Sequence, residues 1–282
     1  MRRFLILILT LALFFNSLTS SAQDSKQIIE NMLAAIARVN TLKFKLKRVE
    51  RIEGKYLRSE AEMKFSKPLK AAYSYMLNPT KGLEILYVDG KNGNNACVNP
   101  NSFPYVTLNL DPYGSTMRKD NHHTIHEVGF RYISGIISHM IGKSGADYDK
   151  YFSYQGEVSL ENRPCYKIVI DYTPFKYMPY TVKPGETITS IGYSHFVSDY
   201  LILEKNPDID DYYDVIPGQI IMVPNAYAAK TILYIDKVNY MPVFQAMYDE
   251  KGLYEQFEFL NLQVNPVIPD EEFTKEYKDY NF

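Results

Sequence analysis

Alternation of apolar and polar residues with a period of two dominates the chain on both sides of a short interruption. It begins at Thr41 in LKFKLKRV and continues through YLRSEAEMKF, LKAAYSYML and LEILYV. In the first run Leu42, Phe44 and Leu46 share one face and three lysines share the other, which is typical of a strand with one buried and one wet face. We therefore expect a long antiparallel meander.

Similar alternating runs resume in EVSL and CYKIVIDY, and again in KTILYID, MPVFQAMYD and LYEQFEFLNLQV near the end of the chain. Apolar residues at helical spacing predict helices from Lys26 to about Val39 and from His123 to about Gly142. The order helix, strands, helix, strands predicts an α+β fold, in which one large curved antiparallel sheet carries helices on one face.

The N-terminus has the pattern of a secretory signal peptide over residues 1–22. Met1-Arg2-Arg3 is positive, Phe4 to Phe15 is apolar, and Ser20-Ser21-Ala22 is a small-residue cleavage site. The apolar run is too short for a spanning helix, and no cysteine stands at the cleavage site to carry a lipid anchor. We expect an exported, periplasmic protein that is not an integral membrane protein.

Composition is compatible with a globular, mostly β protein. The chain is 46% hydrophobic, and its formal net charge of -2 gives no indication of nucleic-acid binding. An oxidising compartment would allow Cys97 and Cys165 to pair, but their spacing does not decide whether they do.

The interruption of the alternating pattern, from Tyr180 to Pro224, has the signals of a small βααβ unit. A short strand from Tyr180 to Lys183 ends at the turn residues Pro184-Gly185, and Thr187 and Ser198 can cap two helices. A last strand follows the Pro217-Gly218 turn and ends at Pro224.

The run V-K-P-G-E-T-I, followed by S-I-G, V-S, N-P-D-I and V-I-P-G-Q-I-I-M-V-P, resembles the LysM domain, a small module that binds N-acetylglucosamine glycans such as peptidoglycan and chitin. In that family the sugar lies in a groove between the loop after the first strand and the loop after the second helix. Two departures are Glu186, where the family often has aspartate, and Gly192, where it often has alanine. The resemblance implies seven glycan-binding residues, with Ile188 and Ile209 against the sugar: Gly185, Glu186, Thr187, Ile188, Pro207, Asp208 and Ile209.

The rest of the chain is similar to the LolA/LolB-like lipoprotein carrier superfamily, whose unclosed half-barrel holds acyl chains on a concave face covered by helices. MRKDNHHTIHEVGF and YIDKVNYMPVFQAMYDEKGLYEQFEFLNLQVN look like an uncharacterised bacterial envelope family often grouped with those carriers. The resemblance implies a discontinuous half-barrel of residues 23–177 and 228–282, with a LysM-like domain inserted at 178–227. It also implies helices on the concave face and a lipid or acyl-chain ligand.

A histidine cluster, His122, His123 and His126 with Glu127, could carry chemistry. On a helix His122 and His126 would share a face as two metal ligands do, yet HHTIHE lacks the HExxH order and no third ligand is marked. We favour imidazoles that hydrogen-bond loop carbonyls, and we predict no metal, no cofactor and no catalytic residue.

Three hypotheses follow. The first is a non-catalytic envelope protein that binds peptidoglycan through the LysM module and an apolar ligand through the half-barrel. The second is a scaffold in which the barrel is filled and only the module binds. The third is a metal-dependent cell-wall hydrolase that uses the His122, His123 and His126 cluster.

Overall fold

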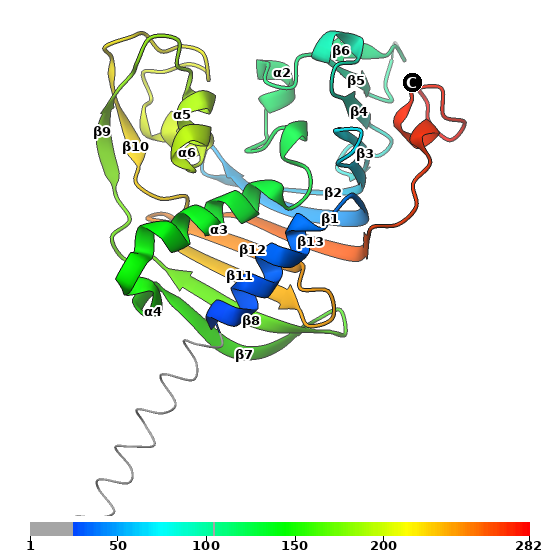
Figure 1. Ribbon diagram of the computed structural model, residues 1–282. Helices are drawn as coiled ribbons and strands as arrows, with labels where there is room; N and C mark the ends of the chain where they lie inside the picture. The colour runs from blue at the N-terminus through cyan, green and yellow to red at the C-terminus, as the bar shows by residue number, and fades with distance from the viewer. Residues whose placement is uncertain (1–24, 104) are drawn as a thin grey trace, which may run out of the picture.

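A computed structural model describes residues 25–103 and 105–282 (Figure 1), so the predicted signal peptide lies outside the described residues. Eleven strands form one antiparallel sheet in the order β6-β5-β4-β3-β2-β1-β13-β12-β11-β8-β7. Within the described residues β6 and β7 each pair with a single neighbour, so the sheet is not closed, as predicted. The strands are β1 (Thr41–Ile52), β2 (Lys55–Ser66), β3 (Ala71–Asn78), β4 (Glu84–Val88), β5 (Ala96–Asn99), β6 (Leu108–Leu110), β7 (Phe152–Leu160), β8 (Arg163–Asp171), β11 (Lys230–Asp236), β12 (Pro242–Asp249) and β13 (Gly252–Val264).

Pairing of β1 with β13 joins the two ends of the chain into one sheet. In this register Leu46 faces Phe259, and Glu50 faces Glu255. Leu42 and Phe44 are buried in the main core, as the alternation predicts, whereas Lys45 on the opposite face forms a surface ion pair with Glu60. The half-barrel therefore depends on a contact between segments far apart in the sequence.

Two helices cover the concave face side by side, one over residues 25–37 and the other α3 (Arg131–Ser144). Their apolar faces share one core with the sheet, and Ile29 of the first helix and Ile137 of α3 are almost fully buried. Burial of each such side chain contributes roughly 1.5–3 kcal/mol. The short helical elements are η1 (Asn92–Asn94), α2 (Ser115–Arg118), η2 (Ile125–Glu127), η3 (Gly145–Asp147), α4 (Tyr148–Tyr151) and η4 (Asp270–Phe273).

The prediction that the second helix begins at His123 is wrong. Only the single turn η2 forms there, and α3 starts at Arg131. Gly129 lies between them with φ of 100°, a conformation incompatible with a helix and one that L side chains rarely adopt. Residues 122–129 are therefore a mostly irregular segment along the concave face.

The βααβ module consists of β9 (Tyr177–Thr181), α5 (Ile188–His195), α6 (Asp199–Lys205) and β10 (Ile220–Pro224). Strands β9 and β10 pair antiparallel. The predicted caps are confirmed, because Thr187 Oγ1 accepts from Ser190 N (3.1 Å) and Ser198 Oγ accepts from Leu201 N (3.3 Å). The module has its own apolar core of Val182, Ile188, Ile191, Val197, Ile202, Ile209, Tyr212, Ile221 and Val223.

The module occupies a connection between two neighbouring strands. Strands β8 and β11 are antiparallel partners, with Asp171 opposite Lys230. The chain enters and leaves side by side, because Asn225 N donates to Lys176 O (2.9 Å) and Lys176 N donates to Asn225 Oδ1 (3.0 Å). Tyr227, which the sequence assigned to the module, lies in the main core.

Ion pairs and apolar contacts fix the module against the half-barrel. Arg118 of α2 donates to both carboxylate oxygens of Asp199, each at 3.0 Å. Arg51 of β1 pairs with Glu204 (3.3 Å), and Leu201 of α6 is fully buried in the main core. The module is therefore packed on the half-barrel and is not held by its two linkers alone.

We predict that replacing residues 177–224 with an Asn-Gly turn between Lys176 and Asn225 leaves a half-barrel that still unfolds cooperatively. It should be less stable than the whole chain by about 2–3 kcal/mol, since the main core loses the buried side chain of Leu201. Urea denaturation followed by near-UV circular dichroism measures this. An excised chain without near-UV signal would mean that the module is part of the core and that the two-domain division is wrong.

Candidate functional site

A cavity of about 170 Å³ lies between the concave face of the sheet, α3 and the segment 112–129. Its walls are mostly apolar and include Phe44 and Leu46 of β1, Met63 of β2, Ile133 of α3, and Phe257 and Phe259 of β13. An apolar cavity of about 150 Å³ can stay dry and bind a molecule the size of benzene. This cavity can therefore hold a small apolar group.

One end of the cavity is polar. Because β1 and β13 pair in register, successive inward rows change from Leu46 and Phe259 to Arg48 and Phe257, and then to Glu50 and Glu255. Arg48 and Glu255 line the cavity together with apolar neighbours, while Glu50 is buried beyond it. A ligand in this cavity would meet an apolar wall along its length and polar groups at one end.

Glu255 is the centre of the polar end and is fully buried. It accepts a hydrogen bond from Tyr227 OH (2.8 Å), and its other oxygen lies 3.1 Å from His122 Nδ1 and 3.0 Å from His123 Nε2. Burial alone would raise the pKa of Glu255, but the two histidines outweigh it and lower the pKa to about 2. Glu255 is therefore held as a carboxylate.

His123 links Glu255 to Glu127. Its Nδ1 lies 2.6 Å from Glu127 Oε2, and Tyr193 OH of α5 donates to the other oxygen of Glu127. Burial lowers the pKa of His123, but Glu255 and Glu127 outweigh it and hold that pKa well above its ordinary value. The chain from Glu255 through His123 and Glu127 to Tyr193 joins the sheet to the LysM-like module.

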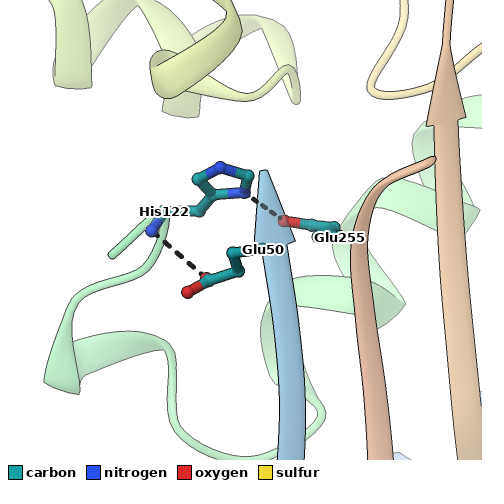
Figure 2. Close-up of side chains that lie close together, drawn as sticks. All are labelled: Glu50, His122 and Glu255. Carbon is teal, nitrogen blue, oxygen red and sulfur yellow. Dashed lines mark hydrogen bonds and ion pairs between the residues drawn. The ribbon is translucent and has the colours of Figure 1, made fainter. Parts of the chain in front are cut away.

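His122 lies beside this chain, between Glu50 and Glu255 (Figure 2). Its backbone N–H donates to Glu50 Oε1 (3.2 Å), and its Nε2 lies 3.0 Å from the carbonyl oxygen of Arg51. One ligand atom from each of Glu50, His122 and Glu255 falls within 4.8 Å of the others, and all three residues are buried. These are the residue types that could hold a divalent metal ion.

The histidine cluster inferred from the sequence does not form. His126 stacks against Tyr113 (ring centroids 4.7 Å) and makes an edge contact with Tyr87 (4.5 Å), away from His122. The pairing of His122 with His126 on a helix is wrong because residues 122–124 are not helical and only the single 3-10 turn η2 covers His126. His122 does contact a backbone carbonyl, but the expectation of a loop carbonyl is wrong, because Arg51 belongs to β1.

Glu50 and Glu255 were not among the candidate site residues inferred from the sequence, although the alternating pattern contains a signal for them. Each lies on an inward row that is otherwise mostly apolar: Glu50 follows Leu42, Phe44, Leu46 and Arg48, and Glu255 precedes Phe257 and Phe259. A carboxylate at a position where the alternation requires an apolar side chain must find a partner.

In the module, the two predicted groove loops meet. Ile188 N donates to Tyr212 O (2.9 Å), which joins the loop after β9 to the loop after α6. Gly185, Pro207 and Asp208 are exposed. The loops that the resemblance assigns to the glycan thus lie beside each other with part of their surface open.

Other predicted groove residues serve the fold of the module. Ile188 is fully buried and Ile209 is 5% exposed, so the expectation that their side chains touch the sugar is wrong. A module this small uses both isoleucines as core. Glu186 accepts hydrogen bonds from Tyr180 OH (2.8 Å) and Lys183 N (2.9 Å), and Thr187 caps α5.

Two family models match the chain. Residues 39–177 match Protein of unknown function (DUF1571), and residues 180–224 match the LysM domain. The module is therefore a LysM domain, and neither match indicates an enzyme family. No curated protein matches the chain.

Several solved structures are similar to the chain at low identity. A LolA superfamily protein from Nitrosomonas europaea has 12% identity and a TM-score of 0.34, over 90% of this chain and 98% of that one. The Mycobacterium tuberculosis lipoprotein LppX has 13% identity and a TM-score of 0.40, over 86% of this chain and 96% of that one. MucB has 11% identity and a TM-score of 0.43, over 89% of this chain and 62% of that one.

Two further findings concern membrane-spanning helices and the cysteines. Among the described residues no helix is long and apolar enough to cross a membrane. Cys97 in β5 and Cys165 in β8 are free thiols, and the two strands are far apart in the sheet order.

We predict that Glu127→Ala lowers the free energy of unfolding by about 3 kcal/mol, because it breaks the close pair with the half-buried His123, which keeps only Glu255, and removes the acceptor of Tyr193 OH. Tyr193→Phe should cost only about 1 kcal/mol, the value of one hydrogen bond. Urea denaturation measures both. The control is Glu157→Ala, which removes a surface pair with Lys237 and should cost at most about 1 kcal/mol. Equal effects for Glu127→Ala and Glu157→Ala would contradict the role given to the network.

Proposed function

We propose that this chain is a non-catalytic, exported cell-envelope protein that binds a glycan through its LysM domain and an apolar ligand through its half-barrel. The observation that carries the proposal is the presence of two distinct sites in one packed molecule. One is the pair of LysM loops around Gly185 and Asp208, and the other is the apolar cavity on the concave face.

The glycan is peptidoglycan or another polymer that contains N-acetylglucosamine, the ligand class of the LysM family. The side chains of Ile188 and Ile209 are committed to the core, so backbone groups of the two loops supply the contacts, with Gly185, Pro207 and Asp208 at the surface. The pattern of residues 1–22 supports export to the periplasm, where peptidoglycan lies.

The ligand of the half-barrel is a lipid or acyl chain that enters the cavity with an alkyl segment. Each buried methylene contributes about 0.8 kcal/mol, so a segment of a few carbons supports weak binding and a longer chain supports more. The cavity of about 170 Å³ accommodates only part of an acyl chain. Binding a whole chain requires α3 or the segment 112–129 to move outward.

The cavity also separates this proposal from the alternatives. A filled concave face was the feature expected of a pure scaffold, and the cavity counts against it. The hydrolase hypothesis required His122 and His126 to face one ion, and His126 lies between two tyrosine rings instead.

For the glycan site, we predict that Asp208→Arg reduces pelleting of the protein with purified peptidoglycan sacculi by about tenfold in apparent Kd, equal to about 1.4 kcal/mol. Asp208 is exposed, so a long side chain there obstructs the groove without disturbing the fold. Soluble chitin oligomers should compete with the sacculi.

The control is Asp171→Arg, at an exposed position of β8, which changes the net charge by the same amount away from the groove. If both variants pellet as well as the unchanged protein does, the glycan assignment is wrong.

For the cavity, we predict that Ala61→Trp abolishes binding of a fluorescent fatty acid. Ala61 lines the cavity from β2, and a bulky ring there fills it. The control is Glu62→Trp, the next residue of the same strand, whose side chain is exposed on the opposite face. Fluorescence titration should show binding to the control and to the unchanged protein. Unaltered affinity in Ala61→Trp would place the ligand elsewhere.

A further inference from the structure

Two buried carboxylates face each other across β1 and β13. Glu50 and Glu255 are direct cross-strand partners, and their exposed fractions are 1% and 0%. Like charges directly opposite each other in a sheet are destabilising, and burial strengthens the repulsion. A cation between them would remove it.

His122 reaches the same point from the segment after α2. Its Nδ1 lies 3.1 Å from Glu255 Oε2, and a carboxylate oxygen of Glu50 lies within 4.8 Å of both atoms (Figure 2). Two ligands of a tetrahedral zinc lie roughly 3.4 Å apart, given bonds of about 2.1 Å. The His122 and Glu255 atoms are already near this spacing, and the Glu50 oxygen is the third ligand atom within 4.8 Å.

We propose that Glu50, His122 and Glu255 form a buried site for one divalent first-row transition ion, of which zinc is the ion to test. An imidazole nitrogen with two carboxylate oxygens is a donor set that such ions accept. The proposal goes beyond glycan and lipid binding and does not depend on either.

Each of the three ligands is held by an outer partner, as metal ligands in proteins are. His122 Nε2 lies 3.0 Å from the Arg51 carbonyl, which leaves Nδ1 to face the site. Glu50 pairs with Arg48 Nε (3.1 Å), and Glu255 accepts from Tyr227 OH (2.8 Å). His123 Nε2, 3.0 Å from Glu255, is a further outer partner.

Zinc binds a neutral imidazole nitrogen and ionised carboxylates, so zinc affinity at such a site falls as the pH is lowered.

Three protein ligands leave one tetrahedral position for a water molecule, but burial closes that position to substrate, so the site is structural. The side chains of Glu50, His122 and Glu255 are 2%, 1% and 0% exposed, whereas a catalytic ion keeps an open position for substrate. The His122 ring also stacks on Tyr200 of α6, with centroids 4.2 Å apart. The ion thus fixes the segment 112–129, which forms one wall of the cavity, to the sheet. The stack of His122 on Tyr200 connects the same segment to the LysM domain.

The test uses the full mature chain with a histidine-free purification tag. The protein is stripped with chelator, titrated with zinc, and analysed by calorimetry and by metal content after gel filtration. We expect one zinc per chain and a rise in Tm of about 5–10 °C at roughly a hundredfold excess over Kd.

Two variants locate the ion. Glu50→Gln keeps the shape of the ligand but removes its charge, and should lose both the bound zinc and the rise in Tm. The matched control combines His126→Phe, His139→Phe and His195→Gln, which removes every histidine outside His122 and His123 and should still bind one zinc.

The proposal is overturned if the unchanged protein binds less than one zinc per chain and its Tm does not shift. Glu50, His122 and Glu255 would then be held together by hydrogen bonds alone. Loss of zinc in the triple control with retention in Glu50→Gln also overturns it, since the ion would then be on the surface. If Glu50→Gln does not fold, X-ray absorption of the zinc-loaded unchanged protein decides. One imidazole with carboxylate oxygens supports the site, and an all-oxygen or multi-imidazole set refutes it.

Discussion

The buried carboxylate of Glu255 is the constraint on which the arrangement of the molecule depends. A charged side chain that is fully buried needs a partner for its charge, and removal of its partners costs several kcal/mol. Its partners come from separate parts of the chain: Tyr227 from the linker after the module, and His122 and His123 from the segment after α2. Satisfying one side chain therefore fixes the position of two connecting segments on the sheet.

The same network determines how the LysM domain sits. Glu127 receives a hydrogen bond from Tyr193 of α5, and Arg118, four residues before His122, holds Asp199 of α6. Phe196 packs against Gly135 of α3, where an added Cβ would lie 3.0 Å from its ring. Helix α5 thus contacts residues 122–129 and, through its C-cap, α3. Helix α6 contacts α2 and His122, so the cavity wall and the LysM domain support each other.

Local patterns in the sequence predicted much of this structure. Alternation from Leu42 onward specifies the strands, and the caps at Thr187 and Ser198 specify the module, because each depends on near neighbours. The errors arise where distant residues decide. The partnership of Glu50 with Glu255 depends on the register of β1 with β13, and the burial of Ile188 and Ile209 depends on how a small module closes its core.

The side-by-side exit of the module at Lys176 and Asn225 has a mechanical consequence. If the LysM domain is anchored to the cell wall and the half-barrel is pulled away, tension enters β8 and β11 at the same end and in the same direction. Their mutual hydrogen bonds then carry no load. The load passes as shear to the bonds with the outer neighbours β7 and β12, where many bonds perpendicular to the strands resist together. The ion pairs of Arg118 and Arg51 with the module act in parallel as a second fastening.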